Sequence, residues 1–316
     1  MHYWKGLEAV PAAVGPTVVT IGNFDGVHLG HCQVLDRVVQ QAKQRDAKSV
    51  AITFDPHPAL VHRPESAPEL IMGLADRIDT LDAVGLDAVL MIHYTLQFAQ
   101  NSAEDFVREV FVDKLGAVAV VVGHDVRFGK DNAGDFAYMC ELGEKYGFDV
   151  IGVQDVGDKR RLSSTWVREE LSAGNVEGAA EILGRPHRMR GEVVHGAKRG
   201  RELGFPTANL SSDASGIIPA DGVYAGWLVD EADMRWPAAI SVGSNPTFDG
   251  VSRVVEAHVI DRPSEDFGDF DLYGQQIVVE FVKHLRPMVA YRGIAALIEQ
   301  MNEDVEQARS VLSQQA

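Results

Sequence analysis

Five short apolar runs in the first half of the chain constrain its fold most, because helix-sized segments separate each run from the next. The runs cover residues 17–21, 49–54, 88–92, 117–122 and 149–153, and they are rich in valine, isoleucine and alanine. Near-continuous apolar strands with this spacing are typical of a parallel sheet that is buried on both faces. The sequence therefore predicts a doubly wound α/β domain, which binds ligands beyond the carboxyl ends of its strands.

The pattern changes after residue 184, where glycine and proline become frequent and no helix-sized segments separate the apolar runs. Residues 276–285 alternate, so that Ile277, Val279 and Phe281 share one face of a strand. Short alternating strands joined by turns predict a small antiparallel β-barrel.

A helix is expected to close the barrel from about Ala290 onward. Its apolar stripe consists of Ile294, Leu297, Ile298, Met301, Val305, Ala308 and Leu312. We place the domain boundary near Arg185, which gives an α/β domain at residues 1–185 and a barrel with its C-terminal helix at residues 186–316.

Composition excludes several classes of protein. The 316 residues include 29 basic and 46 acidic side chains, and a formal net charge of −17 disfavours binding to nucleic acid. No apolar run approaches the roughly 18 residues of a membrane span, and the first residues do not resemble a secretory signal. Cys32 and Cys140 are too few for a disulfide framework. We therefore expect a cytoplasmic protein that binds neither nucleic acid nor membranes.

The most distinctive motif, IGNFDGVHLGH at residues 21–31, joins the first strand to a predicted helix. A helix N-terminus attracts anions, and Gly22 and Gly30 allow a ligand to approach the backbone closely. His28 and His31 lie one turn apart, so both imidazoles could donate hydrogen bonds to a phosphoryl group in transfer. Each histidine alone would more often be an ordinary polar residue. A metal pair is a further alternative, although no third ligand stands nearby in the sequence.

This segment resembles the H-x-G-H signature of the nucleotidylyltransferase superfamily, in the extended form found in prokaryotic bifunctional FAD synthetases (riboflavin kinase/FMN adenylyltransferase). Further matches to that family follow in order at residues 54–58 (FDPHP), 123–129 (GHDVRFG) and 163–168 (SSTWVR). The resemblance implies direct transfer of AMP from ATP to FMN with release of pyrophosphate. Two positions depart from the family pattern, which usually has an aromatic residue at Val126 and often a basic residue at Asn132.

The resemblance implies that His28, His31 and Arg168, together with Mg²⁺, neutralise charge during the transfer. Further contacts to nucleotide or flavin are implied for Gly22, Asn23, Phe24, Asp25, Gly30, His57, Asp125, Ser163, Ser164 and Thr165. From the residues alone, the hydroxyls at 163–165 are equally well explained as a helix cap, and Asp125 as a turn residue.

A second glycine-rich segment, HGAKRGRELGFPTAN at residues 195–209, lies in the predicted barrel. Its local positive charge attracts a triphosphate, although a solvated basic hairpin loop explains the composition equally well. Thr207 and Asn209 present two neutral oxygens on one side of an extended segment. Mg²⁺ accepts a few protein oxygens of this kind and takes its other ligands from phosphates and water.

The run GFPTAN resembles the riboflavin kinase signature of the same family. The resemblance implies that Thr207 and Asn209 hold Mg-ATP and that Glu256, within VEAH at residues 255–258, removes the proton from the ribityl 5′-hydroxyl. Without the family, an outward-facing strand glutamate would be expected at position 256. The other nucleotide or flavin contacts implied for this module are Gly196, Lys198, Gly200, Gly204, Asn245 and Arg286.

The resemblance covers most of the chain and implies a bifunctional enzyme. It would convert riboflavin and ATP to FMN and ADP, and then FMN and ATP to FAD and pyrophosphate. Two alternatives are a chain with one active module and a flavin-binding protein without activity. We expect small-molecule partners only, Mg²⁺ as the metal, and a monomer or weak homo-oligomer.

Overall fold

The computed structural model describes residues 1–154, 157, 160–196, 203–247, 250–261, 271–289 and 293–314. The chain divides into two compact units, made of residues 1–69 with 74–163 and of residues 70–73 with 164–316. Each unit is described by itself. The segment 164–185 groups with the second unit by its contacts, whereas the predicted module boundary lies near Arg185. The boundary between the functional modules stays a prediction.

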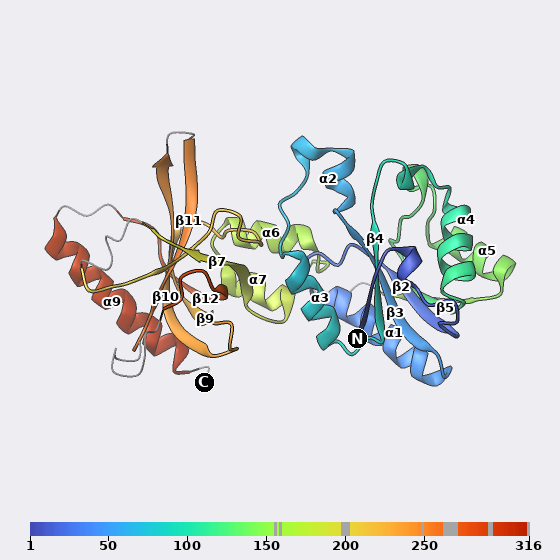
Figure 1. The fold of residues 1–316 in the computed structure, drawn as a ribbon, viewed down its shortest axis with the longest axis horizontal. Helices are drawn as coiled ribbons and strands as arrows, with labels where there is room; N and C mark the ends of the chain where they lie inside the picture. The colour runs from blue at the N-terminus through green and yellow to red at the C-terminus, as the bar shows by residue number, and fades with distance from the viewer. Residues whose placement is uncertain are drawn as a thin grey trace. The chain divides into compact units, whose positions relative to one another are not determined.

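The first unit is built on a parallel sheet with the strand order β1-β4-β3-β2-β5-β6 (Figure 1). Its strands are β1 (His2–Lys5), β2 (Thr17–Ile21), β3 (Lys48–Asp55), β4 (Ala88–His93), β5 (Ala117–Gly123) and β6 (Asp149–Val153). The five predicted strands are confirmed within a residue of the expected bounds. The edge strand β1 was not predicted, because Trp4 is its one buried residue and its pattern is weak.

Helices cover both faces of this sheet (Figure 1). The helices of this unit are α1 (Leu29–Gln44), α2 (Pro58–His62), α3 (Leu74–Ala83), α4 (Ala103–Phe106), its continuation η4 (Val107–Lys114) and α5 (Phe136–Tyr146). Short 3₁₀ turns occur at η1 (Leu7–Ala9), η2 (Pro64–Ser66), η3 (Phe98–Gln100) and η5 (Lys130–Asn132). Leu35 and Val38 of α1 are fully buried, and Phe111 and Met139 from η4 and α5 belong to the main core cluster. The doubly wound fold is therefore confirmed.

The strand order reverses next to β2, since β3 and β4 follow on one side of it and β5 and β6 on the other. The connections that leave β2 and β5 therefore diverge at their carboxyl ends. Open α/β sheets bind ligands in the crevice at such a switch point.

The second unit contains a closed antiparallel barrel with the strand order β10-β11-β8-β7-β12-β9. Two helices precede it, α6 (Ser164–Ser172) and α7 (Val176–Leu183). The strands are β7 (His187–Val194), β8 (Ala208–Leu210), β9 (Gly222–Val229), β10 (Arg235–Thr247), β11 (Gly250–Val259) and β12 (Gln276–Arg286). Ile277, Val279 and Phe281 of β12 are fully buried, so the predicted inward face is confirmed.

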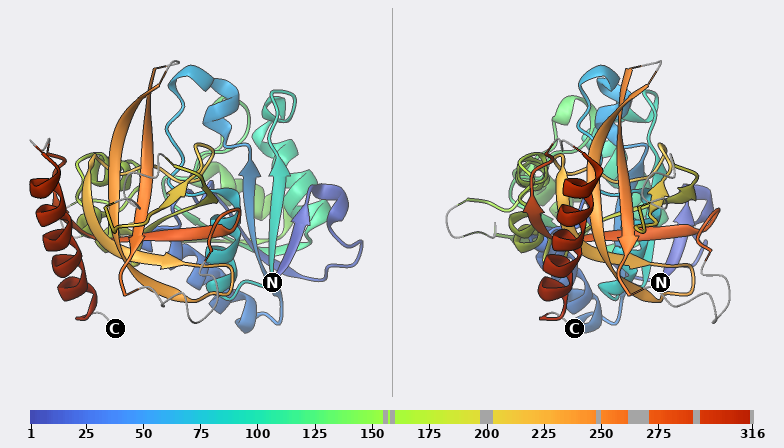
Figure 2. Two further views of the ribbon diagram at one scale, coloured as in Figure 1. Left: turned by 60° about the vertical axis from the view of Figure 1, so that its left-hand side comes forward. Right: turned by 90° about the vertical axis from the view of Figure 1, so that its left-hand side faces the viewer.

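Helix α9 (Ile294–Leu312) packs against the barrel (Figure 2). Its Ala308 and Leu312 join Trp227 and Val282 of the barrel in one buried cluster. The predicted apolar stripe was wrong at its first member, because Ile294 is 65% exposed. The helix begins four residues later than expected, and its first turn, residues 294–296, is exposed throughout.

Candidate active sites

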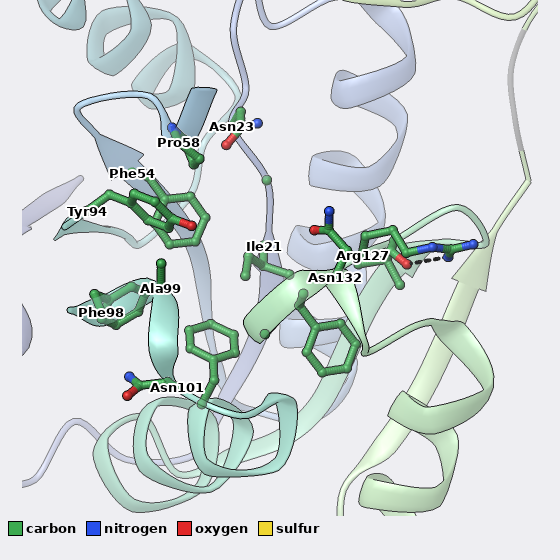
Figure 3. Close-up of a pocket in the computed structure, with 15 residues that line it drawn as sticks. Ile21, Asn23, Phe54, Pro58, Tyr94, Phe98, Ala99, Asn101, Arg127 and Asn132 are labelled. Carbon is green, nitrogen blue, oxygen red and sulfur yellow. Dashed lines mark hydrogen bonds between the residues drawn. The ribbon is translucent and has the colours of Figure 1, made fainter. Parts of the chain in front are cut away.

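A pocket of about 190 Å³ opens at the carboxyl edge of the parallel sheet (Figure 3). It is lined by Phe54 at the end of β3 and by segments that follow β2, β4 and β5, including Asn23, Tyr94 and Phe128. The pocket thus lies at the switch point between β2 and β5, where the fold predicts a ligand. The departures from the family pattern, Val126 and Asn132, both line this pocket.

Three aromatic rings form one wall of the pocket (Figure 3). The ring centroids of Phe54 and Tyr94 are 5.4 Å apart, and those of Tyr94 and Phe98 are 5.8 Å apart, both with edge-to-face geometry. Such a wall suits a flat heterocycle, and the amides of Asn23 and Asn132 add polar groups to the lining. Tyr94 and Phe98 were missed from the sequence, because they belong to no motif.

The two histidines lie together at the start of α1, as predicted. His28 is the N-cap residue, and its Nδ1 accepts a hydrogen bond from the backbone N–H of His31 at 3.3 Å. The two rings stack with centroids 3.7 Å apart, and His28 is 6% exposed. Because Nδ1 accepts, the neutral ring of His28 carries its proton on Nε2, where it can donate. A Cβ atom at Gly30 would lie 3.1 Å from this ring, so glycine leaves room for it.

The turn that leads into this helix is strained. Phe24 has φ 49° and Val27 has φ 37°, a region that non-glycine residues rarely occupy. Phe24 is buried and presents its ring to His31, with centroids 5.3 Å apart, and Asp25 beside it is 3% exposed. Packing therefore holds the turn in the conformation that brings the histidines together.

Other residues predicted for the first site have defined local partners. Asp125 is exposed and forms an ion pair with Arg161. His57 caps α2, where its Nδ1 accepts from the backbone N–H of Ala59 at 3.1 Å. Their contacts to a ligand stay predictions.

The predicted helix start in the motif at residues 163–168 is confirmed, because α6 begins at Ser164. Ser163 ends the first compact unit, while Ser164, Thr165 and Arg168 belong to the second. Arg168 is half-buried and lies one turn along α6. The roles of these four residues stay predictions.

The second set of predicted residues converges on strands β8 and β11. Asn209 of β8 is paired in register with Glu256 of β11, so their side chains share one face. The Nδ2 of Asn209 donates to the Oγ1 of Thr207 at 3.2 Å. A Cβ at Gly196 would lie 2.4 Å from the Oδ1 of Asn209, so this close approach requires glycine. The structure therefore brings all four residues together.

Glu256 is half-buried, and this burial raises the pKa of its carboxyl group above the ordinary value. Its side chain lies on the face of β11 opposite the buried Val255 and Ala257, as expected for an outward-facing strand glutamate, but it is not fully solvated. A raised pKa makes the carboxylate a stronger proton acceptor.

His258, two residues further along β11, was not assigned a role from the sequence. Its Nδ1 lies 2.8 Å from the carbonyl oxygen of Pro206, and its ring packs edge-on against Phe205. Burial lowers the pKa of His258, which favours a neutral ring that donates from Nδ1 to this carbonyl. His258 thus ties the segment that contains Thr207 to the strand that contains Glu256.

The structure gives less support to a substrate contact for the other residues predicted in the second module. Arg286 donates from Nε and Nη2 to Asp304 of α9, at 2.7 Å and 2.6 Å. Gly204 has φ 89°, a conformation that favours glycine. Lys198, Gly200 and the side chain of Asn245 lie outside the described residues.

Two family models match the chain, FAD synthetase at residues 11–166 and riboflavin kinase at residues 183–312. The bifunctional riboflavin kinase/FMN adenylyltransferase of Pseudomonas fluorescens is 36% identical, with 100% of this chain and 99% of the relative covered. The protein of that name from Escherichia coli (strain K12) is 33% identical, with 92% and 91% covered. A crystal structure titled macrolide-efflux protein from Streptococcus pneumoniae matches with a TM-score of 0.87 and 29% identity, covering 98% of this chain and 99% of that one. Among the described residues, no helix combines the length and apolar character needed to cross a membrane.

Proposed function

Because the chain belongs to the family of bifunctional riboflavin kinase/FMN adenylyltransferases, we propose that two separate groups of its residues carry the two reactions. The N-terminal module is an FMN adenylyltransferase and the C-terminal module is a riboflavin kinase. The proposal is carried by the observation that the key residues of the two reactions belong to different compact units of the chain. The histidine pair belongs to the first unit, whereas Thr207, Asn209 and Glu256 belong to the second.

For adenylyl transfer, the aromatic pocket receives the isoalloxazine ring of FMN. The FMN phosphate attacks the α-phosphorus of ATP, the bond to the leaving phosphate breaks, and pyrophosphate departs. His28 donates from Nε2 to phosphate oxygens, the ring of His31 stacks on it, and the N-terminus of α1 adds positive potential. The stacking distance of 3.7 Å between the imidazoles supports this joint role.

Several further residues are proposed to contribute to the same reaction. Arg168 clamps phosphate oxygens, with the hydroxyls of residues 163–165 nearby in the sequence. The other contacts proposed for nucleotide or flavin are the backbone of Gly22, Phe24, Asp25 and Gly30 and the side chains of Asn23, His57 and Asp125. Asp125 would have to bind a heterocycle while it is paired with Arg161.

For riboflavin phosphorylation, Glu256 accepts the proton of the ribityl 5′-hydroxyl as that oxygen attacks the γ-phosphorus of ATP. The bond to the β-phosphate oxygen breaks and ADP leaves. The raised pKa of Glu256 and its position opposite Asn209 support this role. His258 would act by positioning the strand segment, as its contact to Pro206 indicates.

The residues at positions 207 and 209 fit a magnesium ion. The Oγ1 of Thr207 and the Oδ1 of Asn209 are neutral oxygens of the kind that Mg²⁺ accepts, and the two side chains are in contact, with Nδ2 of Asn209 donating to Oγ1 at 3.2 Å. Mg²⁺ bound here would complete its shell with phosphate oxygens and water. When bound it would neutralise charge on the triphosphate.

The remaining parts of the proposal concern further substrate contacts, the oligomeric state and the location of the protein. We assign ATP contacts to Gly196, Lys198, Gly200 and Gly204, and flavin contacts to Asn245 and Arg286. We further propose that the chain acts as a monomer or weak homo-oligomer. The ATP consumed in both reactions supports a cytoplasmic location.

Chromatography of flavins after incubation with riboflavin and Mg-ATP tests the proposal. The expected products are FMN first and FAD later. FMN alone, or FAD only when FMN is supplied, would indicate a single active module. Bound but unchanged riboflavin, with FMN also unchanged when it is supplied, would indicate a flavin-binding protein without activity.

A further inference from the structure

Arg77 of α3 is a buried cation that no motif marks. Its side chain is 5% exposed, and it reaches two backbone carbonyls at the edge of the parallel sheet. Nη1 donates to the carbonyl oxygen of Asn23 at 3.0 Å, and Nη2 donates to that of Phe54 at 3.1 Å. One guanidinium therefore joins the segment after β2 to the end of β3.

Both carbonyls belong to residues that line the aromatic pocket. Phe54 contributes a ring to its wall. Asn23 begins the strained turn that runs through Phe24 and Val27 to His28. Arg77 thus connects the proposed flavin wall to the turn that presents the proposed phosphate-binding histidines.

The carbonyl of Asn23 is held twice, because the hydroxyl of Thr53 also donates to it at 3.1 Å. Thr53 is fully buried on β3. Non-glycine residues in the left-handed region are strained and persist only where their surroundings fix them. The hydrogen bonds from Arg77 and Thr53 to the carbonyl of Asn23 fix the backbone immediately before Phe24.

Charge favours arginine at this position. Burial lowers the pKa of Arg77, while Asp55, whose Oδ1 lies 3.9 Å from Nη2, and Asp25 oppose that shift. A charged donor makes stronger hydrogen bonds than a neutral one, and the planar fork can bond two separate acceptors at fixed angles. A lysine ammonium has no such fork.

We propose that Arg77 is a positioning residue for adenylyl transfer, which sets the spacing between the aromatic wall at Phe54 and the histidine turn that begins at Asn23. This inference rests on the function proposed for the pocket. Arg77 contacts neither substrate and acts through the two carbonyls.

The test compares Arg77→Met, Arg77→Lys and Thr53→Val in the full chain, with FAD formation from supplied FMN and Mg-ATP as the readout. Riboflavin phosphorylation in the same preparations reports on folding and concentration. Arg108→Met is the matched control, because Arg108 pairs with Asp105 on the surface of the same unit. Displacement of reacting groups by about 1 Å can cost about 100-fold in rate.

Arg77→Met is expected to lower kcat/KM for adenylylation by about 100-fold, with kinase activity and the control unchanged. Arg77→Lys should recover part of this loss, and Thr53→Val should lower adenylylation by a smaller factor. The Arg77→Met and Thr53→Val effects should be non-additive, since both donors hold one oxygen. A purely structural role would not produce this coupling or affect adenylylation selectively.

Two results would overturn the inference. One is a folded Arg77→Met variant with adenylylation within about threefold of the parent. If that variant does not fold, the Thr53→Val and Arg77→Lys variants are compared with the variant that combines them. Losses of adenylylation activity that are strictly additive would then contradict the inference. Failure of the proposed function itself would look different, because the unsubstituted chain would then form no FAD from FMN.

Discussion

Glu256 of β11 lies directly opposite Asn209 of β8, and the two side chains share one face of the barrel wall. Asn209 in turn holds the hydroxyl of Thr207, two residues away on the same face. Strand register therefore fixes the carboxylate of Glu256, whose pKa is raised, opposite the amide of Asn209, whereas Thr207 lies in the segment just before β8. Sites built on strands are held more rigidly than sites on loops.

Glu256→Gln should abolish FMN formation from riboflavin and leave FAD formation from supplied FMN intact, because the amide cannot accept the 5′-hydroxyl proton. Both rates can be measured on one preparation by flavin chromatography. Undiminished kinase turnover in this variant would remove Glu256 from its role.

The same substitution should not lower stability. Burial raises the folded-state pKa of Glu256, so its contribution to stability is present below its unfolded pKa and is lost as the pH rises through the folded value. At neutral pH the charge is a cost, and glutamine removes it. Thermal unfolding at pH 7 should give an equal or higher midpoint, and a clearly lower midpoint would show that the carboxylate is held by favourable partners.

The pH profile provides a separate check on the base. Because the pKa of Glu256 is raised from the ordinary value of 4.5, the acidic limb of kinase kcat/KM should lie above that pH. The rate should fall as the pH drops through this limb. Adenylylation, measured in the same buffers, should not show the same limb. A kinase profile that is flat to pH 4.5 would contradict the assignment.

His28→Ala should lower adenylylation by about 10²–10³-fold, as is common for loss of one charge-stabilising donor. Kinase activity should stay unchanged. His2→Ala is a suitable control, because His2 is exposed on the edge strand. Equal loss of both activities in folded His28→Ala would contradict separate sites.

Tyr94→Ala should raise the KM for FMN in adenylylation, since it removes one ring of the aromatic wall, whereas Tyr94→Phe should be close to the parent. Leu96→Ala, at a residue that is 59% exposed, is the control. An unchanged KM for FMN in Tyr94→Ala, measured at saturating ATP, would place the flavin ring elsewhere.

Much of the fold could be predicted because its strands are buried on both faces. Val18, Val50 and Val120 are fully buried, and runs of such residues have few alternatives to a parallel strand. The edge strand β1 and the exposed Ile294 show the limit of this reasoning. Edge strands and first helical turns are only partly buried, so the apolar pattern carries little information there.

The candidate site residues could be predicted where a recognisable motif contains them, and Asn209 and Glu256, from two separate motifs, do lie opposite each other. His28 and His31 are three residues apart and pack ring against ring. The aromatic wall depends instead on strand order, which brings Phe54 next to Tyr94 from separate connections. Arg77 is similar, since its two acceptors are backbone carbonyls that leave no trace in side-chain patterns.

A mixing experiment tests the central claim most directly, that the histidine pair and Glu256 belong to independent and complementary active sites. His28→Ala and Glu256→Gln are each incubated with riboflavin and Mg-ATP, alone and together, and FAD is measured. The account predicts little FAD from either variant alone and abundant FAD from the mixture, because the first supplies FMN and the second adenylylates it. A mixture that forms no more FAD than the sum of its parts would contradict the account.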